Sequence, residues 1–189
     1  MKTIIALTFI LLTLTACGNQ QASIKQYYRI NADQDISLST SHQSLRASVV
    51  ISRPKALSIL GGRPMVATKT DGALVQLNNH YWLESPTILL HDTLKNWAEH
   101  HWQHIQTSAA FNERHDRLDT QILAFEKDGK YAKVSLQFVL TDADGHILID
   151  QTLTQNLTIQ GDGYAHFVQS INLAVTHILS DLNQTLNSL

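Results

Sequence analysis

The stretch Tyr131-Ala-Lys-Val-Ser-Leu-Gln-Phe-Val-Leu140 carries an apolar residue at every even-numbered position. A period of two is that of a β-strand, whose successive side chains point to opposite faces. The even-numbered residues therefore face a core, while Lys133, Ser135 and Gln137 face water. This stretch decides the fold, because a sheet with one apolar face must bury that face against a second layer.

Similar segments flank this strand on both sides. Arg117–Glu126 alternates weakly and ends at the turn Asp128-Gly129, while Ile147–Ile159 alternates clearly and follows the loop Asp142–Gly145. Short turns of this kind join antiparallel neighbours. We expect a three-stranded meander with one wet face. The apolar face of the third strand is expected to hold Ile147, Ile149, Leu153, Leu157 and Ile159.

Two segments have helical periodicity. The first begins with Ser85 as N-cap and Pro86 in the first turn, and its apolar row is expected to run through His101 to Ile105. The second runs from Tyr164 to about Leu186, with Asp162 as a candidate cap. Further strands are expected at Tyr27–Ile30, Ala47–Ser52, Met65–Lys69 and Ala73–Leu77. The order predicts an α+β two-layer sandwich, with a mostly antiparallel or mixed sheet and two long helices packed on one face.

The N-terminus carries a lipoprotein signal. Lys2 precedes an apolar run from Ile4 to Leu14, and Leu14-Thr15-Ala16-Cys17 is a lipobox. The run is too short to span a bilayer comfortably. From this lipobox we predict cleavage of residues 1–16 and acylation of Cys17. Two or more acyl chains anchor a protein firmly to a membrane. Gly18, in place of the aspartate that commonly retains lipoproteins in the inner membrane, favours the inner leaflet of the outer membrane.

Residues 17–26 are expected to form a short tether and residues 27–189 a single periplasmic domain. The 189-residue chain has a formal net charge of −2 and no basic stripe, which argues against a nucleic-acid partner. Cys17 is the only cysteine, so its acylation would leave no thiol for a disulfide or a nucleophile. No cofactor motif is present.

His100 and His104 are the weak candidates for a metal site. On a helix they would have the i, i+4 spacing of two zinc ligands. A zinc protease needs His-Glu-x-x-His, whereas the nearby Glu99 lies outside the pair. We therefore expect polar residues at a helix end and no metal. No Gly-x-Ser-x-Gly motif is present, and no catalytic residue is predicted.

Tyr81 and Trp82 precede the first helix, in what we interpret as a loop. Aromatic residues there either face a partner or lipid surface or pack in the core. Together with Glu84 they form the candidate partner or ligand surface.

Several segments, in this order, resemble one family. A lipobox is followed by a Tyr-Tyr-x-Ile strand, a strand that ends at proline, an Arg-Pro-x-Val segment and an aromatic segment before a helix. In this chain these are Tyr27–Ile30, Val49–Pro54, Leu60–Val66 and Asn79–Pro86, followed by the Asp142–Gly145 meander loop and Tyr164–Val168. The pattern is similar to that of the ABC-type transport auxiliary lipoproteins, including the PqiC-like group. Trp82 and Glu84 align with the family pattern, whereas Tyr81 replaces an arginine.

The resemblance implies a non-catalytic lipoprotein that faces the periplasm. It would act with an MCE-domain protein and inner-membrane transport components that move lipid or apolar solutes between the two membranes. The sequence leaves open a periplasmic ligand-binding lipoprotein or a small envelope hydrolase, and it leaves open self-association into a homo-oligomer.

Overall fold

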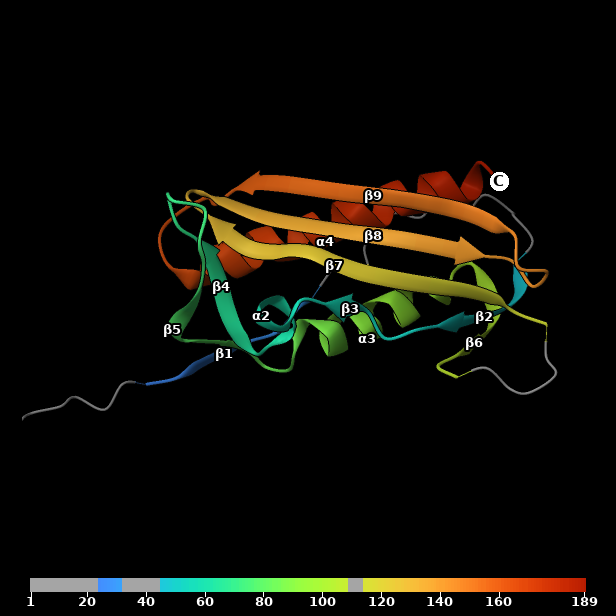
Figure 1. The fold of residues 1–189 in the computed structure, drawn as a ribbon, viewed down its shortest axis with the longest axis horizontal. Coiled ribbons are helices and arrows are strands. Elements are labelled where there is room, and N and C mark those ends of the chain that lie inside the picture. The colour runs from blue at the N-terminus through green and yellow to red at the C-terminus, as the bar shows by residue number, and fades with distance from the viewer. Residues whose placement is uncertain (1–23, 32–44, 109–113) are drawn as a thin grey trace, which may run out of the picture.

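A computed structural model of the chain describes residues 24–31, 45–108 and 114–189. Within them, a mixed sheet of nine strands is covered by helices, which confirms the predicted α+β class. The strand β7 (Asp116–Asp128) is central, and different strands pair along its two edges. Figure 1 shows the molecule elongated along the direction of its long strands.

One edge of β7 begins the predicted meander. β7 pairs antiparallel with β8 (Tyr131–Thr141), which pairs antiparallel with β9 (Ile147–Thr158). The three long strands lie side by side in Figure 1. The even-numbered positions of β8 from Ala132 to Leu140 are buried, as the alternation predicts.

A bulge at Leu123 changes which side chains of β7 reach the core. Ile122 pairs with Leu136 and Ala124 pairs with Ser135, so Leu123 is the extra residue and is 41% exposed. After the bulge, Phe125 joins the core. Glu126 then points to the face without helices, where Thr68 Oγ1 donates a hydrogen bond to it at 3.1 Å.

The other edge of β7 pairs with three short strands, one after another and all parallel to it. They are β2 (Arg46–Ile51), β3 (Lys55–Ala56) and β4 (Pro64–Thr68). β6 (Trp102–Gln106) lies parallel to β2. Beyond β4, β5 (Leu74–Trp82) lies antiparallel to β4, and β1 (Gln26–Tyr28) lies parallel to β5.

The helices bury their apolar faces against this sheet. α4 (Tyr164–Asn187) packs on β8 and β9, and α3 (Pro86–Ala98) contacts β2, β6 and the short α2 (Ser58–Gly61). Side chains of β9 also bond to α4: Gln151 Nε2 donates to Thr185 Oγ1 at 3.1 Å and Gln155 Nε2 to Asp181 Oδ2 at 3.2 Å. The core joins both helices to the meander.

Some predicted boundaries are wrong. α3 ends at Ala98, and the expected helical positions at His101 and Ile105 belong to a turn and to β6. Trp102 explains the change: it is buried, β6 pairs with β2, and its Nε1–H donates to Asp116 Oδ2 at 2.8 Å. Ile147 is 63% exposed, because a register shift beside Leu140 turns it away from the core.

Candidate functional site

The edge formed by β1 and β5 gathers aromatic side chains. Tyr27 of β1 lies in register with Tyr81 of β5, and their ring centroids are 5.6 Å apart. Tyr27 is 49% exposed and Tyr81 is partly buried. Because side chains alternate along a strand, both rings lie on the face opposite to that of Trp82 and Tyr28. The two rings therefore form an accessible aromatic pair at one corner of the sheet.

Two cations accompany this pair. The Arg63 Cζ atom lies 5.2 Å from the centroid of the Tyr27 ring, and the Lys25 Nζ atom lies 5.7 Å from that of Tyr81. Both distances are within the range of cation–π attraction. The Arg63 backbone is fixed by pairing with β5, since its carbonyl accepts a hydrogen bond from the Trp82 N–H at 2.7 Å. We call Lys25, Tyr27, Arg63 and Tyr81 the basic-aromatic edge.

His80 lies on the other side of β5 from Tyr81. Its ring stacks on that of Tyr164, the first residue of α4, with centroids 3.4 Å apart. Its Nδ1 atom is buried and has no hydrogen-bond partner among the described residues. Burial lowers the pKa of His80 below its ordinary value. His80 therefore joins the edge of the sheet to the start of the last helix, in surroundings that favour the neutral form of its ring.

The structure separates Trp82 from the predicted surface. We expected Tyr81 and Trp82 in a loop, but β5 continues through both residues because it pairs there with β1. Trp82 is 1% exposed and its ring packs against Phe125 and Phe167. Its ring is therefore core, and placing it on a partner surface is a wrong interpretation of the aromatic segment.

Glu84 is exposed just beyond β5. The preceding residue, Leu83, donates its backbone N–H to the Tyr28 carbonyl at 2.6 Å, which keeps this segment beside β1. The structure thus places Tyr81 next to Tyr27, with Glu84 near the end of the same strand pair. Sequence reasoning missed Lys25, Tyr27 and Arg63 as neighbours of Tyr81, because two long-range pairings bring them together: that of β1 with β5 for Lys25 and Tyr27, and that of β4 with β5 for Arg63.

His100 and His104 do not lie on a helix. His100 lies in the turn after α3 and His104 in β6, and both are exposed. Within residues 24–31, 45–108 and 114–189, no three His, Cys, Asp or Glu side chains are grouped to hold a metal ion. The helical i, i+4 geometry proposed from the sequence is therefore wrong, because α3 ends at Ala98, before either histidine.

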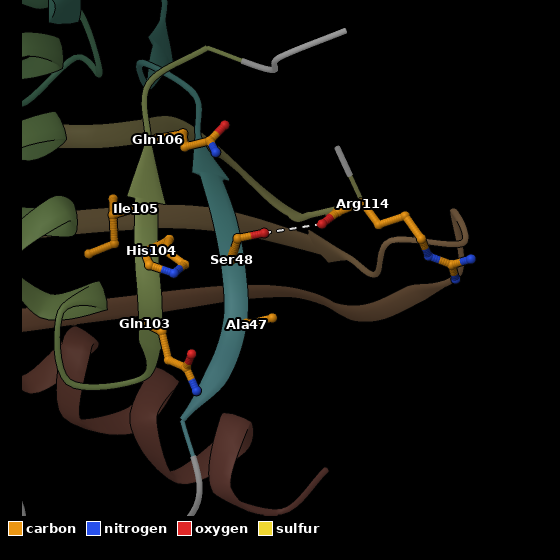
Figure 2. Close-up of a pocket in the computed structure, with 7 residues that line it drawn as sticks. All are labelled: Ala47, Ser48, Gln103, His104, Ile105, Gln106 and Arg114. Atoms are coloured by element: carbon orange, nitrogen blue, oxygen red, sulfur yellow. Dashed lines mark hydrogen bonds between the residues drawn. The ribbon is translucent and has the colours of Figure 1, made fainter. Parts of the chain in front are cut away.

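An open groove of about 720 Å³ lies along β2 and β6, at the end of the molecule away from β1. Figure 2 shows its lining. Ser48 and His104 are neighbours in register, but the Ser48 hydroxyl donates to the Arg114 carbonyl at 3.1 Å. A serine nucleophile needs its hydroxyl hydrogen-bonded to a general base, whereas the Ser48 hydroxyl is bonded to a backbone carbonyl. The groove is lined by Ala47, Ser48, Gln103, His104, Ile105, Gln106 and Arg114.

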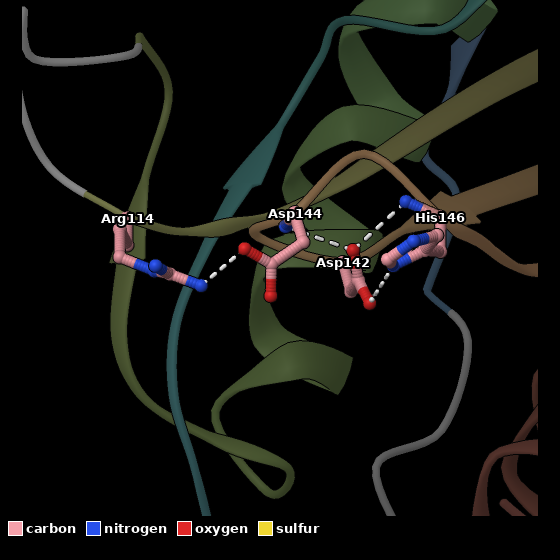
Figure 3. Close-up of polar contacts among 4 residues, drawn as sticks. All are labelled: Arg114, Asp142, Asp144 and His146. Carbon is pink, nitrogen blue, oxygen red and sulfur yellow. Dashed lines mark hydrogen bonds and ion pairs between the residues drawn. The ribbon is translucent and has the colours of Figure 1, made fainter.

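The β8–β9 loop lies near this groove and has a polar network, shown in Figure 3. Asp142 Oδ1 accepts the backbone N–H groups of Asp144 at 2.8 Å and His146 at 2.9 Å. The bond from the His146 N–H, and then that from the Asp144 N–H, lower the pKa of Asp142. Arg114 forms an ion pair with Asp144. These contacts close the hairpin between β8 and β9, which agrees with our prediction of a turn.

Cys17, with residues 1–16 and most of the expected tether, lies outside the described residues. Among the residues that are described, no helix has the length and apolar character needed to cross a membrane.

Comparisons with known proteins identify the fold and the family. The crystal structure of an uncharacterized protein matches with a TM-score of 0.69 and 17% identity, over 86% of this chain and 99% of that chain. A Xanthomonas campestris protein of family DUF330 matches with a TM-score of 0.65 and 16% identity, over 83% of this chain and 92% of that chain. The search of curated protein sequences found no match. The family model described as ABC-type transport auxiliary lipoprotein component matches residues 28–183, and the chain therefore belongs to that family.

Proposed function

We propose that this protein is a lipid-anchored, non-catalytic accessory component of an ABC/MCE-type system that moves lipid or apolar solutes between membranes. Its anchor is the acylated Cys17, its site is the inner leaflet of the outer membrane, and it docks the assembly there. The observation that carries the proposal is the family match, which covers nearly the whole described domain. The lipobox ending at Cys17 agrees with the lipoprotein character of that family.

The fold gives the proposed anchor a consistent geometry. Gln26, the first residue of β1, is nine residues after Cys17. A chain of that length spans at most about 30 Å when fully extended. The β1 end of the elongated domain is therefore held near the bilayer, and the end with the β2–β6 groove is the one we assign to the protein partner, an MCE-domain protein.

The anchoring part is tested with the whole chain in a bacterial envelope. We expect intact-mass analysis of the purified protein to show loss of residues 1–16 and a diacylglycerol plus a further acyl chain on Cys17. Cys17→Ala should remove the acyl mass, and a high-salt wash should then release the protein from the membrane fraction. A Cys17→Ala chain that stays soluble and keeps full transport function would overturn the tethering role. Ser188→Ala, an exposed change near the C-terminus, is the matched control.

The partner assignment is tested by site-specific cross-linking. A photo-reactive amino acid replaces the exposed His104 in the groove, or the exposed Thr70 between β4 and β5. We expect the MCE-domain protein to cross-link to position 104 and not to position 70. Cross-linking at position 70 alone would contradict our assignment of the groove, and capture of no MCE-domain protein at either position would contradict the partner.

A further inference from the structure

The basic-aromatic edge combines groups suited to one kind of surface. Tyrosine has an apolar ring and a polar hydroxyl, which together favour the boundary between headgroups and acyl chains. Lysine and arginine lay their aliphatic stems along apolar surface and keep their charge at the polar boundary. In this chain Lys25 and Arg63 lie over the rings of Tyr81 and Tyr27, so aromatic and cationic groups are presented together.

The described part of the chain offers these cations no acidic ion-pair partner. Among the described residues, none of the ion pairs involves Lys25, Arg63 or the exposed Arg29, which follows β1. Glu84, an exposed acid on the adjoining segment, reduces the local positive charge and is in none of these ion pairs. The edge is thus locally basic on a chain whose formal net charge is −2.

The segment that leads from Cys17 to the basic-aromatic edge indicates which surface the edge faces. Ile24 is 81% exposed and Tyr27 is 49% exposed, so apolar surface continues from the edge toward the N-terminus. Gln26 at the start of β1 is only nine residues after Cys17, as described above. A contact that is weak in free solution becomes substantially occupied when a short linker keeps the two surfaces together.

We propose that the basic-aromatic edge is a membrane contact, which docks on anionic phospholipid headgroups. Lys25 and Arg63 bind the lipid phosphates, and Tyr27, Tyr81 and Ile24 enter the headgroup boundary. The contact fixes the orientation of the domain, so that the β2–β6 groove points away from the bilayer. The proposal rests on the acylated Cys17 of the proposed function for its proximity, and it assigns Tyr81 to lipid rather than to a protein partner.

The test measures how close each end of the domain comes to the lipid. Since Cys17 is the chain's only cysteine and is acylated in the proposed form, one introduced cysteine can be labelled selectively. An environment-sensitive fluorophore is placed through Gln26→Cys in β1 or through Ile147→Cys in the β8–β9 hairpin. The whole processed protein is reconstituted in phosphatidylcholine vesicles with or without phosphatidylglycerol, and nitroxide-headgroup lipids serve as quenchers.

We expect quenching at position 26 in vesicles that contain phosphatidylglycerol, and little at position 147. Lys25→Gln with Arg63→Gln should lower the quenching at position 26, while the acyl anchor and the short tether keep the β1 end near the vesicle surface. Lys69→Gln with Lys130→Gln removes the same charge from exposed positions elsewhere and should change nothing. Equal quenching at positions 26 and 147, or quenching that is indifferent to the Lys25 and Arg63 changes, would overturn the proposal.

A second arm separates this contact from the anchor. The mature Cys17→Ala chain, labelled at position 26, is titrated with the same vesicles. Two neutralised cations should weaken its partitioning into phosphatidylglycerol vesicles about 30-fold. Headgroup quenching without the acyl chain would support the contact even if Cys17 proved not to be acylated. No quenching at any lipid concentration would overturn the contact whatever the state of Cys17.

Discussion

His80 of β5 stacks on Tyr164 of α4, with 3.4 Å between the ring centroids and 27° between the ring planes. This stack joins the outer part of the sheet, next to β1, to the helix that covers the meander. The two residues are far apart in sequence, so the stack closes a long loop in the chain. We therefore expect it to stabilise the position of the β1–β5 edge.

A double-mutant cycle measures this coupling. His80→Ala and Tyr164→Ala should each lower the free energy of unfolding, and the pair should show a coupling of about 0.5–1.5 kcal/mol, as stacked aromatic rings do. Urea unfolding followed by circular dichroism gives the four values. The exposed pair Lys130 and Tyr131, whose contact spans 5.4 Å, is a suitable control and should couple less. Strict additivity for His80 and Tyr164 would contradict the stabilising role.

Trp82 and Tyr81 should respond differently to truncation. Trp82→Ala removes a core ring from its contacts with Phe125 and Phe167 and should cost about 3–5 kcal/mol of unfolding free energy. Tyr81→Ala removes a ring on the accessible face and should cost less than about 1 kcal/mol. Chemical denaturation of both variants decides between the core and surface assignments. Equal small losses would argue that Trp82 is not part of the core.

The Asp116 carboxylate accepts hydrogen bonds from two side chains where β2, β6 and β7 meet. The Arg46 Nε–H donates to Asp116 Oδ2 at 2.6 Å, and the Trp102 Nε1–H donates to the same atom at 2.8 Å. Asp116→Ala would leave the buried Trp102 N–H unpaired, and we expect a loss of about 2–3 kcal/mol. Asp116→Asn keeps an acceptor and should lose less.

The matched control for Asp116 is Asp119, which pairs with Arg117 at the surface. Exposed pairs contribute little, so Asp119→Ala should cost less than about 1 kcal/mol. Thermal melts of the three variants provide the comparison. A smaller loss for Asp116→Ala than for Asp119→Ala would contradict the buried network.

Stability should depend on pH through His101. Burial, and then the nearby charge of His100, lower the pKa of His101 to about 4, against an ordinary value of 6.5. Between these values the unfolded chain binds a proton at His101 that the folded protein does not bind. This contribution to stability is therefore complete above pH 6.5, is lost progressively as the pH falls from 6.5 to 4, and changes no further below 4.

The measurement is the urea midpoint of the native protein and of His101→Phe at several pH values across that window. The His101→Phe variant keeps an aromatic ring beside Trp97 and Trp102 and removes the titrating group. Its midpoint should fall less on acidification than that of the native protein. Parallel pH profiles for the two proteins would show that His101 does not titrate as described.

The architecture follows largely from the sequence. Alternation in Tyr131–Leu140 predicts the buried face of β8, and the helical stripe after Tyr164 predicts α4, since both periods come from backbone geometry alone. The match of segments to the auxiliary lipoprotein family is also local in sequence, and the family model confirms it over residues 28–183. The lipobox at Cys17 stays a prediction of the same local kind.

The composition of the candidate site depends on tertiary structure. Local periodicity does not reveal that β5 continues through Tyr81 and Trp82, because the extension is stabilised by pairing with β1, more than fifty residues earlier in the chain. The alternation along this extended strand places the Trp82 ring in the core and the partly buried Tyr81 ring on the opposite, accessible face. The helical pattern of α3 extends to Ile105 in the sequence, but the helix ends at Ala98. The β2–β6 pairing and the hydrogen bond between Trp102 and Asp116 stabilise a strand in its place. The sequence by itself determined the periods, the turns and the family, whereas long-range strand pairing decided which aromatic and cationic groups meet, because that choice depends on partners distant in the chain.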